Sequence, residues 1–153
     1  MIGKHASDLS AFSDSGYPEP FRSRCLPREK RKLGDAFGLT AFGVNLTTLA
    51  PGAESSMRHW HDREDELVYV LEGELTLRTD EGEETLTAGM VVGFRAGDEN
   101  AHQFVNRSDQ PVRYLEVGNR DSADTARYSD VDLKYGVDTQ GNFVYTHKDG
   151  RPY

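Results

Sequence analysis

The stretch that decides the fold is residues 52–73, which read GAESSMRHWHDREDELVYVLEG. It holds a glycine at each end, His59 and His61 one residue apart, and an apolar run that begins at Glu66. Residues two apart on a strand project from the same face, so both imidazoles would point to one side. A short polar turn follows, and an antiparallel partner strand would bring the Glu66 carboxylate back beside them. The stretch therefore predicts two adjacent strands that carry two histidines and one carboxylate.

A second stretch, residues 89–106, reads GMVVGFRAGDENAHQFVN and adds a third histidine. His102 opens a strand-like run after a polar turn, and a closed barrel would return it to the first cluster. Three neutral imidazoles and one carboxylate suit Zn, Mn, Fe(II), Ni or Co, and they leave coordination positions open for water or substrate. A register slip in the first stretch would place Glu64 or Asp65 where Glu66 is expected, which leaves both as alternative carboxylates.

The rest of the chain predicts a single all-β domain. Short strand-like runs alternate with Gly-, Pro- and Asp-containing turns, a cadence typical of an antiparallel sandwich or barrel and not of βαβ units. The predicted strands are Phe42–Leu49, Met57–His61, Glu66–Leu71, Glu74–Thr79, Glu83–Thr87, Val91–Arg95, His102–Asn106 and Pro111–Val117. We expect an irregular arm over residues 1–40, a barrel core over 41–118, and a C-terminal extension over 119–153 with a short terminal hairpin around Asn142–Tyr153.

Composition and charge narrow the class of protein. The chain has 153 residues, 26 acidic against 18 basic, for a net charge of −8. Residues 62–84 alone hold ten acidic and two basic side chains, so the whole excess lies beside the predicted metal cluster. An acidic excess argues against nucleic-acid binding, and no apolar run is long enough to span a membrane. A single cysteine, Cys25, excludes a disulfide framework, and the start lacks a secretory signal, so we expect a cytoplasmic protein.

The two stretches together resemble the two motifs of the cupin superfamily. The first motif matches at Gly52, His59, His61, Glu66 and Gly73, and the second at Gly89, Gly97, His102 and Asn106. The resemblance implies a single-domain β-barrel of the jelly-roll type (double-stranded β-helix) that binds one divalent metal through His59, His61, Glu66 and His102. Together with the proline-rich arm before the barrel, the resemblance also predicts a homodimer. The sequence departs from the pattern at Arg95, where proline is usual, and in the longer loop between Gly97 and His102.

The function is open at this point. Small cupins of this type are similar to sugar-phosphate isomerases of the mannose-6-phosphate isomerase type and to Fe(II) dioxygenases, which implies an enzyme on a small oxygenated substrate. The alternatives are a non-catalytic metal-stabilised binding module and a purely structural metal. Phosphate would call for Arg or Lys clamps, of which the acidic centre offers few, with Arg58 and Arg95 the nearest candidates. The candidate pocket-lining residues are Met57, Phe104, Arg58, Arg95 and Tyr114.

Overall fold

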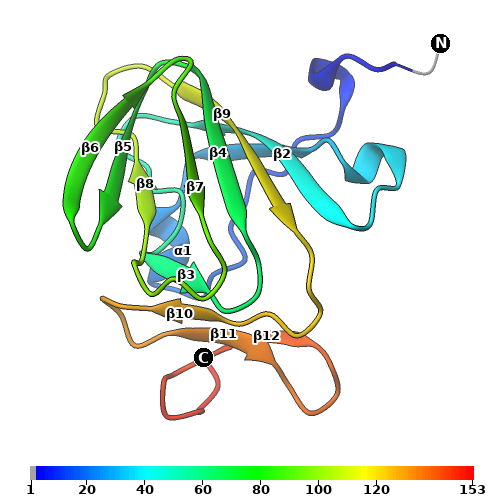
Figure 1. The fold of residues 1–153 in the computed structure, drawn as a ribbon, viewed down its shortest axis with the longest axis vertical. Coiled ribbons are helices and arrows are strands. Elements are labelled where there is room, and N and C mark those ends of the chain that lie inside the picture. The colour runs from blue at the N-terminus through cyan, green and yellow to red at the C-terminus, as the bar shows by residue number, and fades with distance from the viewer. Residues whose placement is uncertain (1–2) are drawn as a thin grey trace.

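A five-stranded antiparallel sheet forms the largest layer of the computed structural model, which describes residues 3–153 (Figure 1). Its strands, in spatial order, are β1 (Arg28–Lys32), β2 (Phe42–Leu49), β9 (Val112–Asn119), β4 (Glu66–Glu72) and β7 (Val91–Phe94). Alternation along β4 directs Glu66, Val68 and Val70 to the inner face, and the two valines are fully buried. The inner face of this sheet is therefore one wall of the core.

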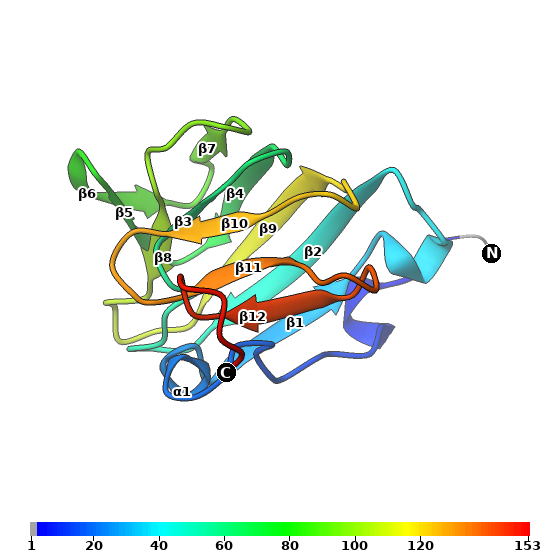
Figure 2. The same ribbon diagram turned by 90° about the horizontal axis from the view of Figure 1, so that it is seen from below.

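Two smaller sheets complete the fold. The first has the order β6 (Gly82–Thr87), β5 (Glu74–Thr79) and β8 (Gln103–Val105). The second has the order β12 (Phe143–Thr146), β11 (Lys134–Val137), β10 (Ala126–Tyr128) and β3 (His59–His61). Figures 1 and 2 show β10, β11 and β12 lying across the end of the barrel where β3 sits. In the described part of the chain, helical structure is limited to α1 (Phe21–Arg24) and two 3₁₀ turns, Ala6–Asp8 and Asp35–Phe37.

Two apolar clusters hold these layers together. The main core fills the barrel, where Val68, Leu75 and Val112 are fully buried and Phe104 packs beside them. The second core joins the chain ends, because Tyr17 and Phe21 of the N-terminal segment pack with Tyr128 and Leu133 of the C-terminal segment. The prediction of an all-β fold is confirmed. Among residues 3–153, no helix is long and apolar enough to cross a membrane.

The structure differs from the sequence-based expectation at the N-terminal end. Residues 28–32, expected within an irregular arm, form strand β1 and pair with β2 over its whole length, from Arg28 opposite Leu49 to Lys32 opposite Asn45. The strand is made of charged residues and has no apolar alternation, so hydrophobic periodicity could not reveal it. Its pairing directs Arg28, Lys30 and Lys32 to one face and Glu29 to the other.

The single cysteine lies in the second core. Cys25 has no exposed surface, and burial raises the pKa of its thiol to about 11. Because the thiolate is the reactive form, we expect Ellman's reagent to label the native protein roughly 100-fold more slowly than the urea-unfolded chain. Equal labelling rates in the two states would contradict this placement.

Candidate metal centre

His59 and His61 are fixed on strand β3 by neighbours on both sides. The backbone of His59 exchanges two hydrogen bonds with that of His102, at 3.0 and 2.8 Å. On the other side, β10 pairs with β3 and places Ala126 opposite His61 and Tyr128 opposite His59. The closed barrel thus returns His102 to the first histidine pair, as the sequence predicts.

The two imidazoles of β3 present unprotonated nitrogens to each other. His59 Nδ1 donates to the carbonyl of Met57 at 2.8 Å, and His61 Nδ1 donates to the carboxylate of Asp124 at 2.6 Å. In a neutral imidazole the other nitrogen then carries a lone pair. The two Nε2 atoms lie only 3.1 Å apart, so these lone pairs face each other at close range. Such an arrangement is stable when a proton or a cation lies between them.

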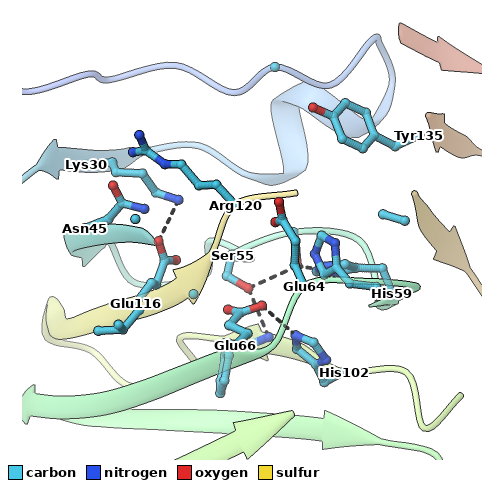
Figure 3. Close-up of a pocket in the computed structure, with 18 of the residues that line it drawn as sticks. Lys30, Asn45, Ser55, His59, Glu64, Glu66, His102, Glu116, Arg120 and Tyr135 are labelled. Atoms are coloured by element: carbon cyan, nitrogen blue, oxygen red, sulfur yellow. Dashed lines mark hydrogen bonds and ion pairs between the residues drawn. The ribbon is translucent and has the colours of Figure 1, made fainter. Parts of the chain in front are cut away.

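Glu66 and His102 complete the cluster. Glu66 begins β4, between Gly118 of β9 and Phe94 of β7, and its Oε2 lies 3.1 Å from His102 Nε2. The Phe94 ring stacks on the His102 ring with centroids 3.6 Å apart, which fixes the plane of that imidazole. Figure 3 shows Glu66, His59 and His102 converging on one end of a cavity.

The protonation states suit a cation. Burial, reinforced by His102 and His61, lowers the pKa of His59 to about 3. Burial alone would raise the pKa of Glu66, but the hydrogen bond from His102 and the neighbouring imidazoles hold it at about 2. His59 is therefore neutral and Glu66 charged near neutral pH, which are the forms that bind a metal.

The donor set fits a divalent metal. Donor atoms of His59, His61 and Glu66 lie within 4.8 Å of one another, and His102 contacts Glu66 directly. The structure thus brings three of the predicted ligands within reach of a single ion and places the fourth, His102, beside Glu66. Three imidazoles and one carboxylate are the ligands of open, reactive metal sites.

The alternative carboxylates have other roles. The Asp65 carboxylate accepts a hydrogen bond from the backbone N–H of Ala96 at 2.7 Å, at the rim of the barrel. The Glu64 carboxylate accepts one from the backbone N–H of Asp121 at 2.8 Å and lines the cavity. Burial raises the pKa of Glu64 above the ordinary value. A register slip is not needed, because β4 begins at Glu66 as predicted.

Sequence reasoning missed Asp124, which lies in the C-terminal extension. Its side chain is almost fully buried and contacts His61, as described above. The bond to this carboxylate raises the pKa of His61, although burial alone would lower it. Asp124 lies 63 residues beyond His61 in the chain, so no local spacing pattern connects the two residues.

The metal cluster opens into a cavity of about 480 Å³ with two unlike ends. His59, His61, Glu66 and Glu64 lie at one end. Besides Arg28, which is bonded to Ser55, three basic side chains line the other end: Lys30, Lys32 and Arg120. They share that end with Asp35 and Glu116, so it carries a net positive charge. Figure 3 shows Lys30 and Arg120 across the cavity from His102.

The basic side chains differ in how they are held. Lys30 Nζ lies 2.7 Å from a carboxylate oxygen of Glu116, with both side chains half-buried. Arg120 pairs with Asp35. Arg28 donates to the backbone carbonyls of Asp14 and Ser55, which anchors the N-terminal segment. Lys32 forms no ion pair within residues 3–153 and is exposed at the cavity mouth.

The five candidate pocket residues are placed differently. Phe104 lines the main cavity, at the boundary with the barrel core. Arg95 lines a second hollow of about 220 Å³ on the opposite side of Glu66 and His102. Met57 lies instead in the second core and Tyr114 in the barrel core, because both face into packed apolar layers.

Arg58 belongs to a surface depression away from the metal cluster. It forms ion pairs with Asp80 and Asp130, and these pairs point its guanidinium away from the cavity. The basic residues that do line the cavity come from β1 and from the end of β9. The expectation that Arg58 is one of the nearest anion-binding groups is therefore corrected, whereas Arg95 shares its hollow with His61, Glu66 and His102.

Comparisons with known proteins identify the family. The family model described as Cupin domain matches residues 45–118. A sugar phosphate isomerase of the cupin superfamily from Silicibacter pomeroyi has 45% identity, covering 96% of this chain and 93% of its own, with a TM-score of 0.91. The chain belongs to the cupin superfamily. The predicted jelly-roll fold of this cupin is thereby confirmed.

More distant structures share the fold of this cupin. A protein of Acidithiobacillus ferrooxidans, provisionally named sugar phosphate isomerase, has 29% identity over 82% of this chain and 80% of its own, with a TM-score of 0.73. A polyketide cyclase of Streptomyces resistomycificus has 24% identity over 78% of this chain and 79% of its own, with a TM-score of 0.65. The comparison with curated proteins finds no match.

Proposed function

We propose that this cupin is a divalent-metal-dependent isomerase that interconverts the carbonyl and hydroxyl positions of a small phosphorylated sugar. The observation that carries the proposal is the two-ended cavity, with metal-type donors at one end and basic side chains from β1 at the other. A phosphorylated sugar has the matching chemistry, since its carbonyl end would bind a metal and its phosphate would bind Arg or Lys.

In the proposed reaction, different residues of the cavity bind the metal, transfer the proton and bind the phosphate. A metal held by His59, His61, Glu66 and His102 would polarise a substrate carbonyl as a Lewis acid. Glu64, a cavity carboxylate beside the metal ligands, would take a proton from the carbon next to the carbonyl and return it to the former carbonyl carbon, while the hydroxyl proton passes to the former carbonyl oxygen. Lys32 at the opposite end would hold the phosphate and thereby orient the carbonyl.

The similarity to the Silicibacter pomeroyi protein supports the same conclusion. That protein is named a sugar phosphate isomerase, and its 45% identity extends over 96% of this chain. The match thus includes the N-terminal β1 strand and the C-terminal segment, both of which line the cavity and lie outside residues 45–118.

The direct test is an isomerisation assay in D₂O. The protein is stripped with a chelator, reloaded with Mn²⁺, Fe²⁺, Co²⁺, Ni²⁺ or Zn²⁺, and incubated with a panel of aldose and ketose phosphates. We expect proton NMR to show interconversion of one aldose–ketose pair and deuterium incorporation at the carbon next to the carbonyl, both dependent on metal. An absence of turnover and of exchange on the whole panel, with metal bound, would contradict the proposal.

The basic end of the cavity has its own test, Lys32→Ala. Because Lys32 is free to bind an anion, we expect its loss to lower kcat/KM for the phosphorylated substrate roughly 10-fold, through KM. The same sugar without its phosphate should be converted equally by both proteins. Lys148→Ala, which removes an exposed lysine outside the cavity, is the matched control and should leave both values unchanged. An equal loss on both sugars would argue against a phosphate site.

A further inference from the structure

We infer that Asp124, which lies outside the matched cupin domain, is a positioning residue that sets the tautomer and the orientation of His61 for metal binding. The inference rests on the metal centre of the proposed function and is independent of the substrate. It makes the C-terminal segment a working part of the metal centre and not only a cover for the barrel end.

Both oxygens of the Asp124 carboxylate are engaged. Oδ2 accepts from His61 Nδ1 at 2.6 Å, and Oδ1 accepts from the backbone N–H of Arg63 at 2.8 Å. The residue is only 2% exposed, so water does not compete for these bonds. The carboxylate is therefore fixed at two points and approaches His61 from the ring edge opposite the cavity.

The pairing of β10 with β3 positions the Asp124 carboxylate beside His61. Asp124 lies two residues before β10, which pairs with β3 so that the backbone N–H of Asp62 donates to the carbonyl of Thr125 at 2.9 Å. From the same strand, the Tyr128 ring lies over His59 with centroids 5.7 Å apart. One short strand of the extension thus contacts both histidines of β3.

The chemical consequence concerns the second nitrogen of His61. A carboxylate accepts hydrogen bonds only, so it selects the imidazole tautomer with the proton on Nδ1 and the lone pair on Nε2, toward His59 and Glu66. Hydrogen bonding of a ligand histidine to a carboxylate also raises the basicity of the imidazole. Asp124 acts through His61 and does not need to touch the metal.

An alternative hypothesis is that Asp124 binds a metal ion directly. Donor atoms of His61, Glu64 and Asp124 also lie within 4.8 Å of one another. The bonds described above occupy both oxygens of Asp124, and Glu64 accepts from the backbone N–H of Asp121. These hydrogen bonds account for the closeness of His61, Glu64 and Asp124 without a second cation. The number of metal ions bound per chain distinguishes a positioning role of Asp124 from a ligand role.

Asp124→Asn is the informative variant because it keeps the shape and changes only the hydrogen-bonding pattern. The amide oxygen must accept from the Arg63 N–H, which turns the amide NH₂ toward His61 Nδ1. That contact selects the opposite tautomer, with the proton on the metal-facing Nε2. We expect the affinity for Zn²⁺ and Mn²⁺, measured by competition with a chelating indicator, to fall 10- to 100-fold. In the metal-free protein, ¹H–¹⁵N NMR should show the His61 proton moved from Nδ1 to Nε2.

Asp62→Asn is the matched control. Asp62 joins β3 to the same C-terminal strand by bonding to Thr125 and Arg127, and within residues 3–153 no hydrogen bond joins its side chain to His61. We expect the control to keep the wild-type metal affinity within about threefold and the wild-type tautomer. A loss shared equally by both variants would mean that Asp124 only tethers the segment, which overturns the inference.

The remaining outcomes are also decisive. Wild-type affinity and an unchanged tautomer in Asp124→Asn would overturn the inference and leave the proposed function intact. Two metal ions in the wild type and one in the variant would make Asp124 a ligand, which overturns the positioning role. No metal binding by the wild type would overturn this inference and the proposed function together.

Discussion

His59→Ala or His61→Ala should strip most of the bound metal from this cupin. Each change removes one of two nitrogens that face each other at 3.1 Å, so the metal loses a ligand that the fold holds in place. We expect the dissociation constant to rise roughly 100-fold or more, at or above the loss typical of removing a residue that merely supports a ligand. Titration with Zn²⁺ and Mn²⁺, followed calorimetrically, measures the change.

Thermal unfolding gives a second readout of the same variants. A metal at about 100 times its dissociation constant stabilises the wild type by roughly 2.7 kcal/mol. For a chain of this size that corresponds to a rise in Tm of roughly 5–10 °C on adding metal. We expect the rise to disappear in both variants, each compared with its own metal-free form, because His59 is also buried and its loss alone destabilises. His147→Ala, in the terminal hairpin, should keep the full rise, and full metal content in both site variants would refute the ligand assignment.

Gly118→Ala should disturb the metal centre by displacing the start of strand β4, which carries Glu66. Gly118 lies opposite Glu66 in the β4–β9 pairing, and a Cβ there would lie 2.7 Å from the backbone carbonyl oxygen of Asp65. Backbone cannot move aside as a flexible side chain would, so the start of β4 must shift and take the Glu66 carboxylate with it. We expect the free energy of unfolding to fall by about 1–3 kcal/mol, the usual cost of overpacking, and metal affinity to fall as well.

Gly43→Ala is the natural control, since Gly43 is the β2 partner of Gly118. A Cβ there meets the Arg120 side chain at 3.6 Å, an ordinary contact distance. This variant should keep the stability to within about 0.5 kcal/mol and bind metal normally. Urea unfolding of both variants, with and without metal, compares the two positions, and wild-type stability and affinity in Gly118→Ala would show that β4 accommodates the added methyl group.

The sequence predicts the strands that carry apolar alternation. The predicted Phe42–Leu49 and Glu74–Thr79 match β2 and β5 in full, and β4 begins at Glu66 as expected. The convergence of His102 with the β3 histidines was also predictable, because glycine-marked turns and regular strand spacing imply a closed barrel. Local pattern was sufficient wherever one face of a strand is buried.

Charged residues were harder to place from sequence. In the acidic segment 62–84, several acids form ion pairs with arginines from distant parts of the chain, such as Glu72 with Arg113 and Asp80 with Arg58. Likewise, the basic residues of β1 line the cavity only because β1 adds to the sheet edge beside β2. Strand register determines both results, and no periodicity in a charged run reveals it.

Asp124 is a residue of the site whose role could not be predicted from the sequence, because it also depends on strand pairing. Its approach to His61 depends on the pairing of β10 with β3, across 63 residues of chain. The sequence around Asp124 carries neither a metal motif nor an apolar pattern, so a residue of this kind becomes visible only when the sheet is assembled.

The most direct test of the account is the metal content of the wild-type protein. The chain is purified without added metal, incubated with Mn²⁺, Fe²⁺, Co²⁺, Ni²⁺ or Zn²⁺ under anaerobic conditions, freed of excess ion, and analysed by inductively coupled plasma mass spectrometry. We expect about one divalent ion per chain with at least one of these metals, because the site has a single set of three histidines and one glutamate. Less than about 0.1 ion per chain with every metal, together with an unchanged melting temperature, would contradict it.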